Sequence, residues 1–445
     1  MDEIRNLIQQ TPFSAAKLLE VIGGMNSVDV ADTFELLNRE ETVQVFRLLP
    51  KTMAADVFSE IVPEKQQIIV EALTDAEVGK IMEELFVDEA VDFIEEMPAN
   101  VVKRVLQNVN EDKRKQINQI LCYPEDSAGS IMTTEYVNLR EYVTVSEAFD
   151  VIRVTGVDKE TIYTCYVIQR DRLLVGMITA KTLLISKPED KIGDIMDKNL
   201  VFAYTTDDQE MVADMFRKYD LLSMPVVDGE KRLVGIVTVD DILEVIEEEN
   251  TEDIEKMAAL NPSEEPYIKT NALRLSRNRL PWLLLLMLSA TVTGAIIEGF
   301  ENALSALPML VAFIPMLMDT AGNAGAQSSA LVIRGMALGE IRIKDVLRVL
   351  WREIQVSVIC GCVMGAVNFL RIYIMNEQNL LMALTVTLSL ILTVIIAKSL
   401  GCLLPIAAKK IRIDPAVMAA PIITTIADAF SLILYFSMAR MIMRI

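Results

Sequence analysis

Polar residues interrupt otherwise apolar sequence at two places in the C-terminal third of the chain. The segment 315–329 carries Asp319, Asn323 and Gln327 at intervals of four among glycines and alanines, and Asp428 lies in the last apolar segment. A carboxylate at the centre of a membrane-spanning helix costs roughly 2.5–3.5 kcal/mol and usually faces protein or a water-filled path. Oxygen donors one helical turn apart suit hard cations such as Mg2+. These residues predict a cation pathway; the alternative is a structural carboxylate bonded to a neighbouring helix.

The charge is distributed unevenly along the 445 residues. The part of the chain over 271–445 has a net charge of +6, whereas the part over 1–270 has a net charge of −27. This asymmetry predicts an acidic soluble part joined to a weakly basic membrane part. The acidic part would repel phosphates, so no nucleic-acid partner is expected, and it would attract cations. The chain has no histidine and five cysteines, which we interpret as reduced, and no nucleophile–base pair is apparent, so an enzyme is disfavoured.

Helical repeats are expected over residues 1–128. The acidic and apolar pattern of 28–34 recurs in kind at 87–93, and each unit continues into an apolar run with helical period. Such spacing predicts stacked helical hairpins in a short superhelix, with an unrepeated helical bundle as the alternative.

An internal duplication marks residues 129–249. The stretch Leu174–Thr179 matches Leu233–Thr238 further along the chain, and each is preceded by a helix signal and a β-branched strand candidate. Strands are predicted at 163–168 and 224–227. This βαββα-like duplication resembles a tandem pair of CBS (cystathionine-β-synthase) domains.

A charged connector helix is expected over residues 250–279, with Asn250 or Thr251 as its cap. Five membrane spans then follow within 280–445, at roughly 281–300, 304–333, 354–375, 379–407 and 415–439. Basic loops between the spans place the soluble domains in the cytosol by the positive-inside rule, so we expect a multi-pass protein of the cytoplasmic membrane. Lys398, inside the fourth span, should snorkel or pair with a carboxylate such as Asp319.

The order of these parts, together with Gly322-Asn323-x-Gly325-x-Gln327 and Ala427-Asp428, resembles the MgtE family of magnesium transporters. The resemblance implies a multidomain membrane protein with an all-α helical-repeat domain, α/β tandem CBS domains and an all-α domain of five transmembrane helices. It also implies a homodimeric Mg2+ channel in membrane lipid with its pore at the subunit interface. Asp428 would coordinate the pore ion, Asn323 matches the second-span motif, and Asp414 matches an acid at the cytosolic pore mouth near a connector helix that plugs the closed pore.

The same resemblance implies that Mg2+ binds acidic clusters between cytosolic domains and closes the gate by neutralising their repulsion. The candidate residues are Asp88 and Asp92; Asp208, Glu210 and Asp220; Asp241 and Glu244; and Glu252 and Glu255.

CBS pairs often bind adenine nucleotides through a Thr-x-x-Asp pattern, which Thr238 and Asp241 fit; the first repeat has Thr179-Ala-Lys-Thr182 and lacks the acid. One site for ATP or another adenine nucleotide is therefore expected. No phosphate-binding Gly-x-x-x-x-Gly-Lys-Ser/Thr loop is present, so flux should run down the electrochemical gradient. Two alternatives stay open: a transporter of other divalent cations (Mn2+, Co2+ or Ca2+), and a membrane-anchored CBS nucleotide sensor in which Asp428→Asn would leave function intact.

Overall fold

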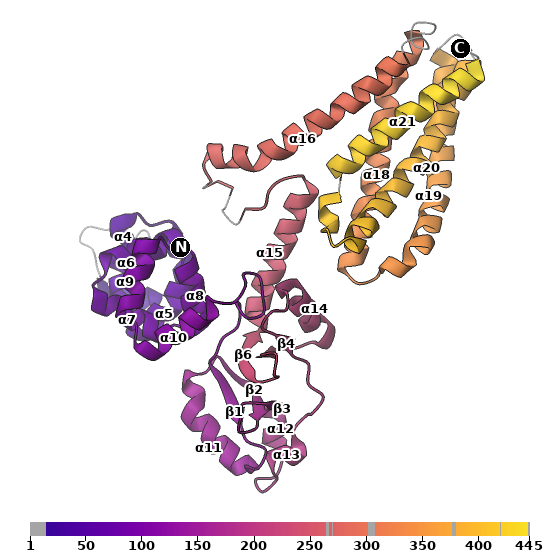
Figure 1. Ribbon diagram of the computed structural model, residues 1–445. Helices are drawn as coiled ribbons and strands as arrows, with labels where there is room; N and C mark the ends of the chain where they lie inside the picture. The colour runs from indigo at the N-terminus through magenta and orange to yellow at the C-terminus, as the bar shows by residue number, and fades with distance from the viewer. Residues whose placement is uncertain are drawn as a thin grey trace. The chain divides into compact units, whose positions relative to one another are not determined.

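The computed structural model describes residues 15–263, 267–268, 270–300, 308–375, 380–418 and 420–443. It divides into two compact units, Met1–Ile246 and Glu247–Ile445, which we describe separately (Figure 1).

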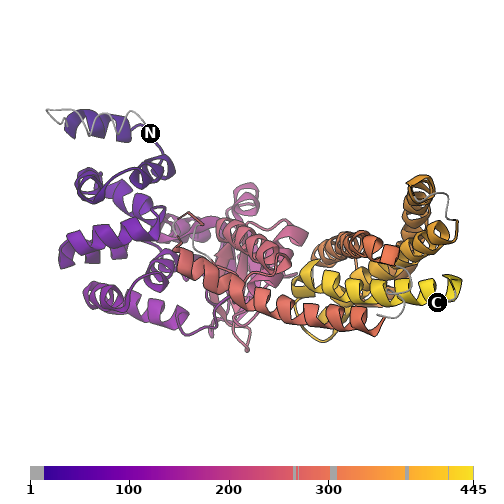
Figure 2. The same cartoon turned by 90° about the horizontal axis from the view of Figure 1, so that it is seen from above.

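Short helices make up the first part of the first unit, as the repeat pattern predicts. They are α2 (Ala15–Ile22), α3 (Ser27–Glu35), α4 (Arg39–Leu48), α5 (Lys51–Ser59), α6 (Pro63–Ala72), α7 (Asp75–Glu84), α8 (Val87–Glu95), α9 (Ala99–Asn108) and α10 (Glu111–Ile120). Helices two places apart in the chain pack together: α3 on α5, α4 on α6, α7 on α9, and α8 on α10. Figure 2 shows them stacked in successive layers. This pattern is that of stacked helical hairpins, whose apolar faces cover one another.

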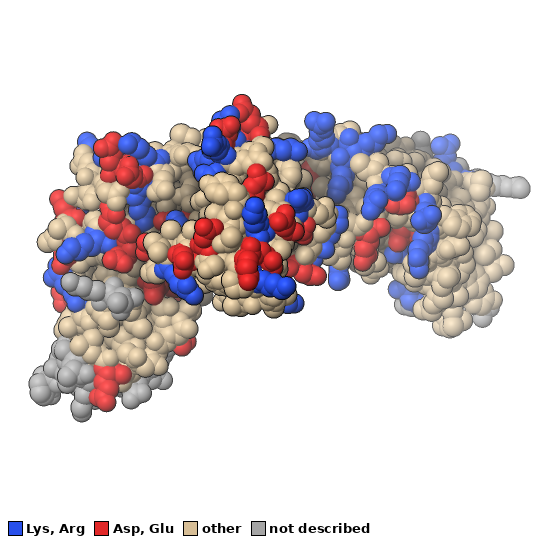
Figure 3. All heavy atoms as spheres, turned by 90° about the horizontal axis from the view of Figure 1, so that it is seen from below, with Lys and Arg blue, Asp and Glu red and all other residues tan. Residues whose placement is uncertain are grey.

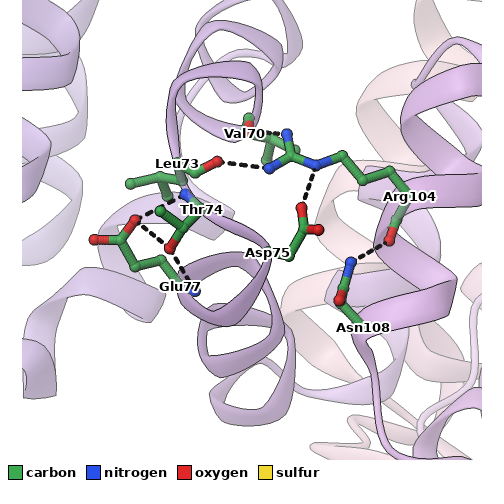
Figure 4. Close-up of polar contacts among 7 residues, drawn as sticks. All are labelled: Val70, Leu73, Thr74, Asp75, Glu77, Arg104 and Asn108. Atoms are coloured by element: carbon green, nitrogen blue, oxygen red, sulfur yellow. Dashed lines mark hydrogen bonds and ion pairs between the residues drawn. The ribbon is translucent and has the colours of Figure 1, made fainter.

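One arginine ties three of these helices together (Figure 4). The guanidinium of Arg104, on α9, donates to the carbonyls of Val70 and Leu73 at the end of α6, at 2.8 and 2.6 Å, and pairs with Asp75 of α7 at 2.7 Å. It therefore satisfies carbonyls that the end of α6 leaves without helical partners. Thr74 and Glu77 form a capping box that starts α7.

Two three-stranded sheets follow, with the same topology. The first contains β1 (Tyr136–Leu139), β2 (Thr161–Ile168) and β3 (Leu174–Thr179), and the second contains β4 (Ala203–Tyr204), β5 (Ser223–Val227) and β6 (Leu233–Thr238). In each, the first two strands are parallel and the last two antiparallel. The helices are α11 (Val145–Thr155), η1 (Gly156–Asp158), α12 (Ala180–Ile185), α13 (Ile192–Ile195) and α14 (Gln209–Tyr219). The predicted duplication is confirmed.

The connector differs from the expected single helix. Helix α15 begins at Val239 and continues through Asn250 and Thr251 to Met257, so neither residue is a cap. The hydroxyl of Thr251 instead donates to the carbonyl of Glu247, one turn back within the helix. The helix ends where Ala259 adopts a left-handed conformation (φ 55°) and the Leu260 amide donates to the Glu255 carbonyl. Pro262 follows, and the next helix begins only at Ala272.

Five long apolar helices of the second unit have the length and composition to cross a membrane. They comprise α16 (Ala272–Gly299); η2 (Pro308–Phe313) with α18 (Ile314–Ala337); η3 (Ile343–Asp345) with α19 (Val346–Met375); α20 (Leu380–Lys410); and η4 (Pro415–Met418) with α21 (Ala420–Met443). Helices α18, α20 and α21 pack against one another, α19 covers α20, and α16 contacts α21 (Figure 1). Part of the expected second span, 304–307, and the start of the fourth, 379, lie outside the described residues. The first helix starts well before Pro281, which lies inside it.

Candidate cation pathway and acidic clusters

The polar residues of α18 lie along one exposed face of that helix. Asp319, Asn323 and Gln327 are exposed, whereas Gly322 and Gly325, between them in sequence, are buried. The buried face packs on α20 and α21. Oxygen-bearing side chains therefore follow one another along a side of α18 that the described residues of the second unit leave exposed.

Small residues allow α21 to approach this helix closely. A Cβ atom built on Gly322 would lie 2.8 Å from the Thr424 methyl group, and one on Gly325 would lie 2.6 Å from a methyl group of Ile423. Any larger residue at these positions would force the helices apart. The contact brings Asp428 of α21 near enough to Asp319 for the two carboxylates to repel each other.

The carboxylate of Asp428 has one fully buried oxygen atom. Its Oδ1 atom is inaccessible to solvent and, among the described residues, has no hydrogen-bond partner. One turn earlier, the hydroxyls of Thr424 and Thr425 donate to the carbonyls of Ala420 and Pro421, at 2.7 and 3.0 Å. Their oxygen lone pairs remain available as acceptors. A carboxylate held by a neighbouring helix, the structural alternative, would need a donor that the described residues do not supply to Oδ1.

Asp414 is part of a charged network at the start of η4. Its Oδ1 accepts from the amide of Ala416, and its Oδ2 pairs with Lys256 of α15 at 2.8 Å. Lys256 also pairs with Glu252 at 2.8 Å. Burial opposes the charged form of Lys256, but these two carboxylates outweigh burial and raise its pKa. The pKa of Asp253 is also raised, mainly by burial and secondly by the charge of Asp414. Sequence reasoning missed Lys256 and Asp253. Glu255, which was a predicted site residue, instead accepts a hydrogen bond from the amide of Ser263.

A second group of acids gathers within the first unit, around Asp88 of α8. Asp88 is buried and its Oδ1 has no hydrogen-bond partner among the described residues. Burial and the charge of Asp241 raise its pKa well above the ordinary value. Burial and the charge of Asp241 also raise the pKa of Glu160 to about 8, and burial raises that of Asp241 to about 6. Other charged groups act on these three: Glu89, Glu135, Asp240, Glu244 and Lys113.

The three carboxylates of Asp88, Glu160 and Asp241 are close enough to repel one another but are not arranged to chelate. Among the described residues, no group of three or more Asp, Glu or Cys side chains is placed to hold a metal ion directly. Glu160, just before β2, is the member that sequence reasoning missed.

Several predicted acids lie elsewhere. Asp92 is exposed one turn beyond Asp88. Asp208 is the N-cap of α14 and accepts from the amide of Glu210 at 3.0 Å, whereas Asp220 is the left-handed residue (φ 51°) that ends the same helix. The 11 residues of α14 separate the two groups by about 16 Å. The structure therefore does not bring Asp208, Glu210 and Asp220 together.

Lys398 is buried and pairs with a carboxylate, but its partner is not Asp319. Its Nζ atom lies 3.9 Å from Oε2 of Glu353, on α19, and donates to the hydroxyl of Ser328, on α18, at 3.4 Å. Ser328 in turn donates to Glu353 at 2.5 Å. The expectation of Asp319 as a partner was wrong because Asp319 lies on the exposed face of α18, whereas Ser328 lies on the buried face.

The two Thr-centred turns differ as the sequence predicts. Oδ2 of Asp241 accepts from the hydroxyl and the amide of Thr238, at 2.6 and 3.3 Å, which fixes the carboxylate at the start of α15. In the first repeat, Thr179 bonds to the amide and hydroxyl of Thr182. A hydroxyl beside a carboxylate can bond the hydroxyls of a ribose. Of the two turns, only the second offers that pair, because the first has a threonine in place of the aspartate.

Family models cover most of the chain. Residues 314–438 match a divalent cation transporter model, residues 25–126 match the MgtE intracellular N domain, and residues 128–187 and 192–248 match the CBS domain. The chain is 35% identical to the magnesium transporter MgtE of Thermus thermophilus over 96% of this chain and 95% of the relative. It is 33% identical to that of Bacillus subtilis over 94% and 92%.

A solved structure supports the fold of the first unit. It is the crystal structure of the cytosolic domain of the Mg2+ channel MgtE in complex with ATP, which is 34% identical to this chain with a TM-score of 0.52, and the match covers 54% of this chain and 98% of that one. The fold, the site residues on α18 and α21 and the end-to-end similarity lead to one conclusion: the chain belongs to the MgtE family of magnesium transporters.

Proposed function

We propose that this chain forms a Mg2+ channel of the cytoplasmic membrane, which Mg2+ crosses down its electrochemical gradient and which cytosolic Mg2+ closes. The observation that carries the proposal is the unpartnered Oδ1 of Asp428 beside the polar face of α18. A cation is the partner that satisfies such a carboxylate within apolar helices. Oxygen donors suit Mg2+ but also Mn2+. Competition by Mn2+ and Co2+ during flux therefore separates this proposal from a general divalent-ion transporter.

The pathway requires a second copy of the chain. Asp319, Asn323 and Gln327 would otherwise face hydrocarbon, which cannot satisfy them. A homodimer that joins these faces would enclose a polar path with one Asp428 from each subunit. Two carboxylates could then hold a Mg2+ ion that keeps part of its water, since Mg2+ dehydrates reluctantly.

Closure would depend on the acids around Asp88. Without Mg2+, repulsion among Asp88, Glu160 and Asp241 favours separation of the helical domain from the CBS pair, and a hydrated Mg2+ between them removes that repulsion. Mg2+ thus shifts the population toward the compact arrangement because it binds that arrangement more tightly.

At the cytosolic end of the pathway, the last turns of α15 would act as the plug. Lys256 joins Glu252 of α15 to Asp414, so the helix end is held beside the residue at the proposed pore mouth. Both domains of the first unit would lie in the cytosol, where they sense Mg2+ and transmit its binding through α15.

The second CBS repeat offers one adenine-nucleotide site. A similar cytosolic domain has been crystallised in complex with ATP. Here Thr238 and Asp241 would bond the ribose hydroxyls. Asp241 is also a member of the acidic cluster, so a nucleotide and the regulatory Mg2+ would each change the binding of the other.

Gating is tested by Mg2+ influx into proteoliposomes over a series of Mg2+ concentrations on the side of the first unit. Wild-type flux should fall as that Mg2+ rises, and a variant with both Asp88→Asn and Asp241→Asn should lose the dependence. Asp29→Asn, an exposed acid of α3, is the matched control and should retain it. Persistent Mg2+ dependence in the double variant would refute the sensor, and a flux that is absent in every protein at low Mg2+ would favour a membrane-anchored nucleotide sensor.

A further inference from the structure

A cavity of about 530 Å³ opens where three parts of the first unit meet. Gln119 and Tyr123 line it from the end of α10, Arg170 and Arg172 from the β2–β3 turn, and Asp228 and Arg232 from the β5–β6 turn. We call this cavity the hairpin groove. It is open to solvent, and much of its lining is polar.

The hairpin groove is separate from the Thr238 site. It lies at the beginning of β6, where Leu233 and Val234 border it, whereas Thr238 ends the same strand. The length of the extended strand places the two about 17 Å apart. A ligand in the groove would therefore leave the Thr238–Asp241 pair untouched.

The two turns that form the groove are fixed to each other and hold basic residues in an unusual conformation. The amide of Leu174 donates to the carbonyl of Lys231 at 3.1 Å, and that of Leu233 donates to Arg172 at 2.9 Å. Arg172 and Lys231 occupy equivalent places in the duplication, and both are left-handed, with φ of 62° and 61°. Glycine would adopt this conformation without strain. A left-handed residue is a regular part of a hairpin turn that ends in a bulge, so it fixes the shape of both turns.

The charges in the groove favour an anion. Three arginines line it against the carboxylates of Asp171 and Asp228, and Arg232 also pairs with Glu230. Oδ1 of Asp228 is already engaged, because it accepts from the amides of Glu230 and Arg232 in its own turn, at 2.9 and 2.8 Å. On the face shown in Figure 3, acidic and basic side chains are interspersed.

The geometry of these groups suits phosphate. Guanidinium groups present paired donors that match phosphate oxygens. Arg172 donates to the hydroxyl of Tyr136 at 3.0 Å, which orients it, and Arg170 and Arg232 are exposed at the rim. Tyr123 is half-buried and accepts from Gln119 at 3.4 Å, so an aromatic ring and an amide lie beside the arginines.

We propose that the hairpin groove binds a soluble ligand with two or more linked phosphates, such as a nucleotide or an inorganic polyphosphate. The phosphates contact Arg170, Arg172 and Arg232, and a base stacks on Tyr123. Because Tyr123 follows α10 and the arginines belong to the CBS pair, the ligand ties together the two domains that carry Asp88 and Asp241. The proposal concerns binding and does not depend on the proposed transport.

The test is calorimetric titration of the full-length protein in lipid nanodiscs with tripolyphosphate, in Mg2+-free buffer so that the probe is not complexed. Wild-type protein should bind saturably, and Arg170→Gln and Arg232→Gln should each weaken binding about 10-fold or more, since each removes charge-assisted hydrogen bonds. Arg217→Gln, exposed on α14, should bind as wild type does. Arg153→Gln, exposed on α11, is the matched control and should also bind normally.

Chemical protection provides a second readout that needs no variant. Tripolyphosphate should slow the modification of Arg170 and Arg232 by phenylglyoxal, measured by mass spectrometry, and leave the rate at Arg153 unchanged. Binding that the Arg170 and Arg232 substitutions do not weaken would overturn the proposal. So would an absence of saturable binding by tripolyphosphate and ATP, or binding only to phosphatidic acid vesicles, which would assign the groove to a lipid headgroup.

Discussion

The buried pair of Lys398 and Glu353 makes a sharp prediction about stability. Their charged atoms lie 3.9 Å apart, and their side chains are only 8% and 14% exposed. At that separation the attraction is about 4 kcal/mol for an effective dielectric constant of 20. The bond from Ser328 to Glu353 satisfies a further lone pair. The pair thus joins α18, α19 and α20 on the side of α18 opposite the polar face.

Removing one charge should be far more harmful than removing both. Lys398→Met leaves Glu353 buried without its counter-ion, and Glu353→Gln leaves Lys398 in the same state, so each should lower the free energy of unfolding by about 3–5 kcal/mol. The double variant has no unpaired charge and keeps an acceptor for Ser328. It should therefore be more stable than either single variant and close to the wild type.

The assay is equilibrium unfolding in mixed micelles, followed by the fluorescence of Trp282 and Trp351 together with circular dichroism. Lys410→Met, at the exposed end of α20, is the matched control and should change the free energy by less than about 0.5 kcal/mol. Single variants as stable as the control, or a double variant whose loss is the sum of the two, would refute the account of this pair.

Three further predictions concern the cluster, the helix crossing and the connector. Because the pKa of Asp241 is raised to about 6 and that of Glu160 to about 8, protons stabilise the compact first unit below these values. Without Mg2+, protection from trypsin should therefore decrease as pH rises from about 6 to about 8, and added Mg2+ should restore it; protection that does not vary with pH would contradict this. Gly401→Ala places a methyl group against a backbone carbonyl of α18 and should cost about 1–3 kcal/mol in unfolding experiments, whereas Gly294→Ala, with open space around it, should not. Lys256→Met leaves Glu252 of α15 and Asp414 at the start of η4 without the positive charge between them, so cross-linking of α15 to η4 by an engineered disulfide should become dependent on Mg2+. Cross-linking of this variant without Mg2+ that equals that of the wild type would count against the network.

Local patterns in the sequence were sufficient for much of the fold. The recurrence of Leu174–Thr179 as Leu233–Thr238 revealed the duplication, and the strands predicted at 163–168 and 224–227 correspond to β2 and β5. The helix signal that precedes each stretch corresponds to α11 and α14, whose N-caps are Thr144 and Asp208, because capping depends on residues close together in sequence. The cap expected at Asn250 or Thr251 failed because a threonine within a helix can bond to the preceding turn.

The composition of the charged clusters could not be predicted in the same way. Glu160 precedes a strand with no pattern around it, and its role arises only where the fold brings it near Asp241. The partners of Lys398 and Lys256 likewise come from other elements that are distant in the sequence, Glu353 for the first and Asp414 for the second. The face of α18 was predictable, since a spacing of four residues places side chains on one side of a helix. In the proposed homodimer, a second copy of the chain covers that face.

The most direct test of the proposed channel is Mg2+ influx into proteoliposomes loaded with a Mg2+-sensitive dye, comparing wild type with Asp428→Asn. Ser437→Ala, exposed on the same helix, serves as the control. The account predicts fast influx for wild type and control at low internal Mg2+, and a collapse of influx in Asp428→Asn protein that remains folded. Equal influx in all three proteins would contradict the assignment of Asp428 to the ion path.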